Sequence, residues 1–184
     1  MGKKILIPVA DGTEEIEAVC LIDVLRRAGA DVTVASVGKS LQITASRGVR
    51  MVADQHISDC QKTVYDLIVL PGGMPGAEHL RDNPELISLL RAQKASGRLY
   101  GAMCASPAVV LQTHGLLENM QATCHPAFNE KLVNLKPDRV VVDGTCVTSQ
   151  APGTALEFAL KLVELLFGRQ KAEIVATPML VLSF

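Results

Sequence analysis

The chain has 184 residues, of which 48% are hydrophobic and only 3% aromatic, so we expect a single domain over 1–184 with an aliphatic core. Its formal net charge of −1 excludes the strong basic bias typical of proteins that bind nucleic acid or anionic membranes. The five cysteines include no CxxC pair, which favours free thiols over a zinc ribbon or a thioredoxin-type motif. The first apolar run is too short for a secretory signal and no run is long enough to span a membrane, so a cytoplasmic location is expected.

Patterns typical of strands and helices alternate along the chain. In order, we predict a strand at 4–9, a helix at 14–28, a strand at 31–37, a hairpin-like excursion at 41–53, a strand at 64–70, a helix at 83–95 and a strand at 98–103. A helix begins at 107, residues 113–137 are less regular, and Asp143-Gly144 between two short apolar runs indicates a β-hairpin. A helix at 153–167 and a last helix or packed arm at 170–182 follow.

This alternation predicts an α/β fold, namely a doubly wound, mostly parallel sheet with helices on both faces and a small antiparallel addition. In sheets of this kind, ligands bind beyond the carboxyl ends of the strands. We therefore expect functional residues in the loops at 11–17, 71–78, 103–107 and 150–154.

Cys104 is the most informative residue, because it lies where a predicted strand turns directly into a helix. Small residues surround it at Ala102, Ala105 and Ser106. This arrangement is typical of a nucleophile elbow, in which a tight, strained turn presents one side chain to solvent. Amides at the start of the following helix are expected to lower the pKa of the thiol. The alternative is a buried small residue at a tight strand–helix junction.

Pro71-Gly72-Gly73 ends another predicted strand in the same way. Paired glycines allow the backbone to approach a bound group closely, and their amides would form an oxyanion site beside Cys104. The alternative is a flexible turn. No GxGxxG follows any strand and no metal-ligand spacing is present, so neither a cofactor nor a metal is predicted.

Acids and a histidine complete the candidate site. Glu14, Glu15 and Glu17 lie in the first turn of the first helix, where the helix dipole alone explains acidic residues. A carboxyl beside a thiolate would be partly protonated, and would then hydrogen-bond the thiolate or serve as acid or base, three roles that stay open. His125 precedes a proline, is therefore held extended, and is the best candidate for a general base.

These residues belong to a set of motifs in a fixed order. They are Gly12-Thr13-Glu14-Glu15-Ile16-Glu17, Leu70-Pro71-Gly72-Gly73, Ala102-Met103-Cys104-Ala105, His125-Pro126 and Ser149-Gln150-Ala151-Pro152-Gly153-Thr154. In them the chain resembles the ThiJ/PfpI superfamily, and within it the subgroup of parkinsonism-associated deglycases and their bacterial relatives, nearly end to end.

The resemblance implies a flavodoxin-like sheet, a homodimer, and a reactive Cys104 paired with a protonated Glu17. It also implies that Asp23 accompanies His125 across the dimer. The positions that match the oxyanion-type site are Gly72, Gly73 and Ala105. Those that match the dimer surface or the surroundings of the cysteine are Ile16, Arg26, Arg27, Arg47 and Met51.

Two departures from the family pattern affect the expectations. The protease-like branch carries a histidine directly after the nucleophilic cysteine, whereas this chain has Ala105, so peptidase activity is not expected. Ser106 stands where close relatives often have glycine, and we expect this change to be tolerated, with a narrower pocket as its effect.

The resemblance implies two functions that use the same thiolate. The first is a cofactor-independent glyoxalase and deglycase that acts on methylglyoxal and early glycation adducts and releases lactate. The second is a redox-sensing, stress-protective or chaperone-like protein whose cysteine oxidises to sulfinate. A third possibility is a structural α/β protein without a reactive thiol.

Overall fold

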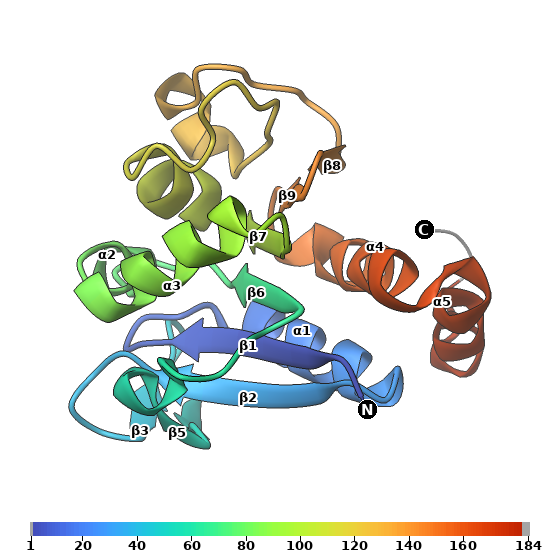
Figure 1. Ribbon diagram of the computed structural model, residues 1–184, viewed down its shortest axis with the longest axis horizontal. Coiled ribbons are helices and arrows are strands. Elements are labelled where there is room, and N and C mark those ends of the chain that lie inside the picture. Colours follow the sequence, from blue (N-terminus) through green and yellow to red (C-terminus); the bar gives the residue numbers. More distant parts are fainter. Residues whose placement is uncertain (1, 182–184) are drawn as a thin grey trace.

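The computed structural model describes residues 2–181, which fold around a seven-stranded sheet (Figure 1). Its order is β5-β2-β1-β6-β7-β9-β8, and only β8 runs antiparallel to its neighbour. The strands are β1 (Lys4–Val9), β2 (Asp31–Ser36), β5 (Gln55–His56), β6 (Leu67–Leu70), β7 (Leu99–Met103), β8 (Val140–Asp143) and β9 (Cys146–Ser149). A separate antiparallel hairpin pairs β3 (Gln42–Thr44) with β4 (Arg50–Val52), as the excursion at 41–53 predicts.

Helices cover both faces of the sheet. They are α1 (Glu15–Arg27), α2 (Gly76–Arg81), α3 (Pro84–Ala95), α4 (Ala155–Phe167) and α5 (Arg169–Ala176), with short helical turns at Ile57–Cys60, Pro107–Gln112, Pro126–Lys131, Pro152–Thr154 and Thr177–Met179. Ile5 and Ile7 share one apolar cluster with residues of α1 and α4, whereas Leu6 between them belongs to the cluster that contains residues of α3. Because side chains alternate along a strand, these clusters lie on opposite faces of the sheet.

The strand order confirms the flavodoxin-like, doubly wound prediction. After β1 the chain adds β2 on one side, then returns to place β6 on the other side of β1. The carboxyl ends of β1 and β6 therefore flank the point at which the winding direction reverses, where such sheets bind ligands.

The structure corrects several predicted boundaries. Helix α2 begins inside the segment 71–78 that we predict as a loop, and its six residues are too few for helical periodicity to show. The helix expected from 107 is a single π-helical turn. In the β8–β9 hairpin, Asp143 pairs with Cys146, so the turn residues are Gly144-Thr145 and not Asp143-Gly144. The predicted final helix is present as α5, although the arm's end at Leu182 lies outside the described residues. Among residues 2–181, no helix has the length and apolar character of a membrane span.

Candidate active site

The register of two parallel strands brings Cys104 and Gly72 together. Leu70 of β6 pairs with Ala102 of β7, so the residues two positions later leave the sheet side by side. The sharp turn expected at Cys104 is present, because this residue adopts φ 61°, a left-handed conformation that is costly for a side chain with a Cβ atom. The residue is only 8% exposed, so the thiol is mostly buried and not openly presented to solvent as expected. Strain of this kind persists where the surrounding structure holds it in place.

Glu17 reaches the same point from α1. Its side chain is fully buried, and Oε2 accepts a hydrogen bond from the Gly72 N–H at 2.7 Å. Its other carboxylate oxygen, Oε1, is buried without a hydrogen-bond partner among the described residues. A Cβ atom on Gly72 would lie 2.5 Å from the Cys104 Cβ and 2.9 Å from the Glu17 Oε2. Gly72 is therefore the spacer across which the thiol and the carboxyl approach each other.

The three acids at the start of α1 have three different environments. Glu14 is the N-cap, and its Oε2 accepts the Glu17 N–H at 2.8 Å. Glu15 turns away, accepting hydrogen bonds from the Ser46 hydroxyl and the Arg47 N–H, both at 2.8 Å. Only Glu17 lies beneath the thiol.

The expected net lowering of the Cys104 pKa is wrong, although the amides have the expected direction of effect. Burial, and then the negative charge of Glu17, raise the pKa of the thiol to about 12, although the amides of Gly73 and Ala105 act in the lowering direction. Burial also raises the pKa of Glu17 to about 7, against the opposing hydrogen bond from Gly72. Two anions so close repel each other, so the pair loses its first proton at about pH 7 and keeps the second well into the alkaline range. Thiolate then exists where that proton resides on Glu17.

His125 lies next to the cysteine through the backbone. Its N–H donates to the Cys104 carbonyl oxygen at 2.8 Å, and φ −59°, ψ 134° confirm the extended conformation expected before Pro126. Its Nδ1 accepts the Ala127 N–H at 3.2 Å, which leaves the proton of a neutral ring on Nε2. The ring also meets Phe128 edge to face, with centroids 6.2 Å apart.

A cavity of about 290 Å³ opens onto the thiol. Ten residues line it: Glu14, Ser46, Arg47, Gly73, Met74, Cys104, Ala105, His125, Phe128 and Pro152. The loops predicted from the carboxyl ends of the strands supply most of them. Ser46, Arg47, His125 and Phe128 lie outside those loops, and of these Ser46 and Phe128 were not predicted. The hydrogen bonds of Glu15 to the turn at 46–47 give no signal in the sequence.

Glu17 and Gly72 lie beneath the thiol and do not line this cavity, and the Gly72 N–H is bound to Glu17 instead of contributing to the expected oxyanion site. Three other expected neighbours do not reach it either. Asp23 and Arg27 form an ion pair with each other at 2.6 Å on the exposed side of α1. Within one chain Asp23 does not contact His125, and its expected approach across a dimer stays a prediction. Ser106 is fully buried, and its hydroxyl donates to the Pro71 carbonyl at 2.6 Å, so the expectation that it narrows the pocket is wrong.

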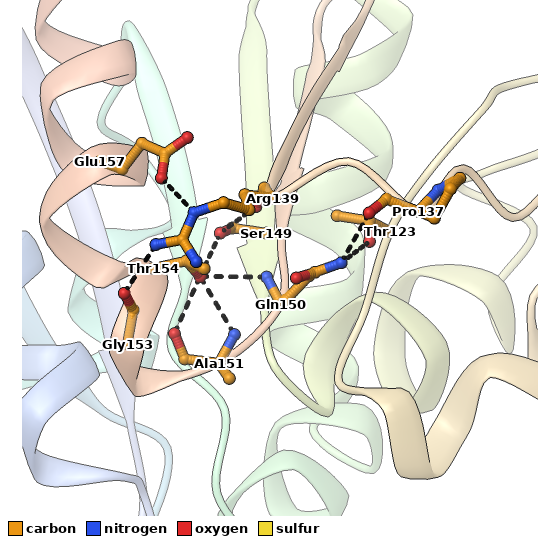
Figure 2. A network of polar contacts seen from close by, with 9 residues as sticks. All are labelled: Thr123, Pro137, Arg139, Ser149, Gln150, Ala151, Gly153, Thr154 and Glu157. Atoms are coloured by element: carbon orange, nitrogen blue, oxygen red, sulfur yellow. Dashed lines mark hydrogen bonds and ion pairs between the residues drawn. The ribbon is translucent and has the colours of Figure 1, made fainter. Parts of the chain in front are cut away.

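A polar network fixes the loop that carries Pro152 (Figure 2). The Thr154 Oγ1 lies 2.7 Å from the Ser149 Oγ and accepts the Ala151 N–H at 3.1 Å. Arg139 joins the loop to α4, because it donates to the Gly153 carbonyl at 3.0 Å and to Glu157 at 2.7 Å. The Pro152 wall of the cavity is thereby held in one position.

Comparisons with known proteins place the chain among relatives of one kind. The DJ-1/PfpI family model matches residues 3–165. Protein DJ-1 homolog B of Arabidopsis thaliana is 51% identical over 91% of this chain, which spans 39% of that longer relative. The glutathione-independent glyoxalase DJR-1.2 of Caenorhabditis elegans is 39% identical over 95% of this chain and 94% of its own length. The structure of oxidized Toxoplasma gondii DJ-1 superposes with a TM-score of 0.97 at 48% identity, covering 98% of this chain and all of that one.

Proposed function

Because the chain belongs to the DJ-1/PfpI family, we propose that it is a cofactor-independent, cysteine-dependent glyoxalase and deglycase that converts methylglyoxal to lactate. The observation that carries this proposal is the meeting of Cys104 and Glu17 across Gly72, at the base of a cavity that His125 also lines. The relative named as a glutathione-independent glyoxalase supports an enzymatic use of this arrangement.

The proposed steps use only the residues of this site and water. The Cys104 thiolate attacks the aldehyde carbon, a C–S bond forms, and the aldehyde oxygen takes up a proton to give a hemithioacetal. The amides of Gly73 and Ala105, which favour negative charge at the cysteine, would stabilise the developing oxyanion. Glu17, or His125 once its Nδ1 is released from the Ala127 N–H, then removes the hydrogen from this carbon. A proton returns to the neighbouring carbonyl carbon and the hydroxyl proton passes to its oxygen, giving a lactoyl thioester. Water cleaves the C–S bond, releases lactate and restores the thiol.

Early glycation adducts enter the same route. A hemithioacetal or hemiaminal of methylglyoxal contains the same three carbons, joined to a thiol or amino group in place of a free aldehyde. The Cys104 thiolate replaces that group on the former aldehyde carbon: a C–S bond to Cys104 forms, and the bond to the amino group or thiol breaks. The freed amine or thiol takes the proton, and the enzyme-bound intermediate is the same. Lactate is again the product.

The function is tested by incubating the protein with methylglyoxal in the absence of glutathione and measuring D-lactate and L-lactate. We expect many equivalents of lactate per chain, with one enantiomer in excess because Cys104 and the base lie on fixed elements. Formation of no more than one equivalent per chain would rule out catalysis. A matched reaction without protein sets the background rate.

The unpartnered Glu17 Oε1 favours a second candidate, a redox sensor or stress-protective protein. A protonated Glu17 would donate a hydrogen bond to an oxygen of a sulfinate on Cys104 and stabilise that state. Chaperone-like activity would belong to the same role. Stoichiometric uptake of peroxide by Cys104 without lactate turnover distinguishes this function from the first.

A homodimer is part of the proposal. Ile16 and Val19 on α1 are 54% and 50% exposed, and the Asp23–Arg27 ion pair lies on the same helix. Packing α1 against a second copy would bury these apolar side chains and bring an acid of the partner toward the site. A sedimentation-equilibrium mass of two chains is the expected result, and the mass of one chain would contradict it.

A further inference from the structure

The cavity above Cys104 has more room than the smallest 2-oxoaldehydes fill. Its volume of about 290 Å³ is at the lower end of the range of ~300–1,000 Å³ that is usual for small-molecule sites. Methylglyoxal carries a single methyl group beside its two carbonyl groups. A substituent larger than methyl therefore fits in the same cavity with the aldehyde carbon at the thiol.

The polar and the apolar side chains that line the cavity come from different elements of the fold. Glu14, Ser46 and Arg47 come from the start of α1 and the turn between β3 and β4. Met74 and Phe128 come from the segments that follow β6 and precede β8, and they carry no charge. Met74 is 41% exposed, so its flexible side chain is free to pack on a ligand.

Phe128 is held in place before any ligand binds. Its ring meets His125 edge to face and Lys131 Nζ lies 5.4 Å from its centroid. The ring also packs against a buried cluster that contains Ala105, the residue directly after the thiol. A pre-ordered apolar ring beside the reacting centre gains binding energy with little loss of conformational entropy.

From these contacts we propose that the site selects 2-oxoaldehydes with an aromatic or branched apolar substituent, and that Phe128, assisted by Met74, determines this selectivity. The selectivity rests on the proposed glyoxalase function and names its substrate class. In the bound substrate, the aldehyde carbon lies at Cys104 and the substituent on the adjacent carbonyl carbon packs on the Phe128 ring. Each additional buried carbon strengthens binding without changing the chemical steps.

The test compares initial rates with glyoxal, methylglyoxal and phenylglyoxal. For the unmodified chain we expect kcat/KM for phenylglyoxal to exceed that for methylglyoxal about tenfold, within the range for added carbons in an apolar pocket. Phe128→Ala is expected to lower the ratio of kcat/KM for phenylglyoxal to kcat/KM for glyoxal by about this factor, mainly through the KM for phenylglyoxal. Met74→Ala is expected to lower kcat/KM for phenylglyoxal by a smaller factor. Phe128→Leu is expected to keep part of the selectivity that Phe128→Ala loses.

Glyoxal has no substituent that could pack on Phe128. Its rate therefore reports any effect that Phe128 has through His125, apart from selectivity. If Phe128→Ala lowers kcat/KM equally for all three aldehydes, Phe128 acts through His125 and the selectivity proposal is wrong. Phe167→Ala removes a partly buried phenylalanine from the far end of α4 and is the matched control, for which unchanged ratios are expected. Changed ratios in this control would mean that the Phe128 effect is a general loss of packing.

Protection of Cys104 from alkylation by iodoacetamide measures aldehyde binding without turnover. It therefore tests the selectivity independently of the proposed function. Lower concentrations of phenylglyoxal than of glyoxal should protect the thiol, and Phe128→Ala should abolish the difference. If this holds while no aldehyde turns over, the site binds the proposed class but the glyoxalase function fails. Equal protection by both aldehydes would overturn the selectivity, whether or not turnover occurs.

Discussion

Replacement of Cys104 by serine is expected to lower kcat/KM for methylglyoxal by at least ~10³-fold, because the hydroxyl is a much weaker acid and nucleophile than the thiol. Serine has nearly the same size and meets the same left-handed backbone, so the fold is expected to be retained. The change therefore removes the attacking atom and leaves Glu17, with its hydrogen bond from Gly72, in place. Lactate formation at several protein concentrations measures the effect.

Cys124→Ser is the matched control for this variant. Cys124 directly precedes His125 and is also buried, but it does not line the cavity above Cys104. We expect it to keep most of the activity. Retention of more than about a tenth of the activity in Cys104→Ser would show that another group starts the reaction.

Gly72→Ala is expected to lower kcat/KM by ~10²-fold or more, because misplacement of reacting groups by about 1 Å has effects of this size. The added Cβ would lie 2.5 Å from the Cys104 Cβ and 3.0 Å from the Ala105 nitrogen, so these atoms must move. Overpacking of this kind also lowers the free energy of unfolding by ~1–3 kcal/mol. Urea unfolding and lactate formation measure the two effects.

Gly153→Ala provides the comparison. An added Cβ at Gly153 meets no atom within 4 Å, and the residue lies in the loop beside Pro152. Activity and stability close to those of the unmodified chain are expected for it. If Gly72→Ala also retained full activity, Cys104 and Glu17 would not need the close approach that the structure shows.

The position of the site could be predicted from the sequence, because small residues around Cys104 and the pair Gly72-Gly73 mark two neighbouring strand ends. Which acid meets the thiol could not be predicted from the helical pattern, and Glu17 followed only from the family resemblance. That choice depends on the residue at which α1 begins, since Glu14 as N-cap directs Glu15 to the turn at 46–47 and Glu17 beneath Gly72.

The sign of the Cys104 pKa shift also depends on packing. Helix-end amides are visible in the sequence as a strand–helix junction, whereas the depth of burial and the distance to Glu17 are not. Burial exceeds the effect of the amides in the folded protein. Phe128 was missed for a related reason, because the irregular segment 113–137 has no periodicity that shows which side chain turns inward.

One proton shared by Cys104 and Glu17 is the feature on which the proposed chemistry depends. The rate of Cys104 alkylation by iodoacetamide, followed by peptide mass spectrometry between about pH 5 and 10, measures it most directly. The proposed sharing allows the remaining proton to reside on either group, so in the unmodified chain the rate should rise through the Glu17 pKa of about 7, at which the pair loses its first proton. In Glu17→Gln that rise should be absent and alkylation should begin only at alkaline pH, since burial still raises the pKa of the thiol. Identical pH curves for the two proteins would contradict the shared proton.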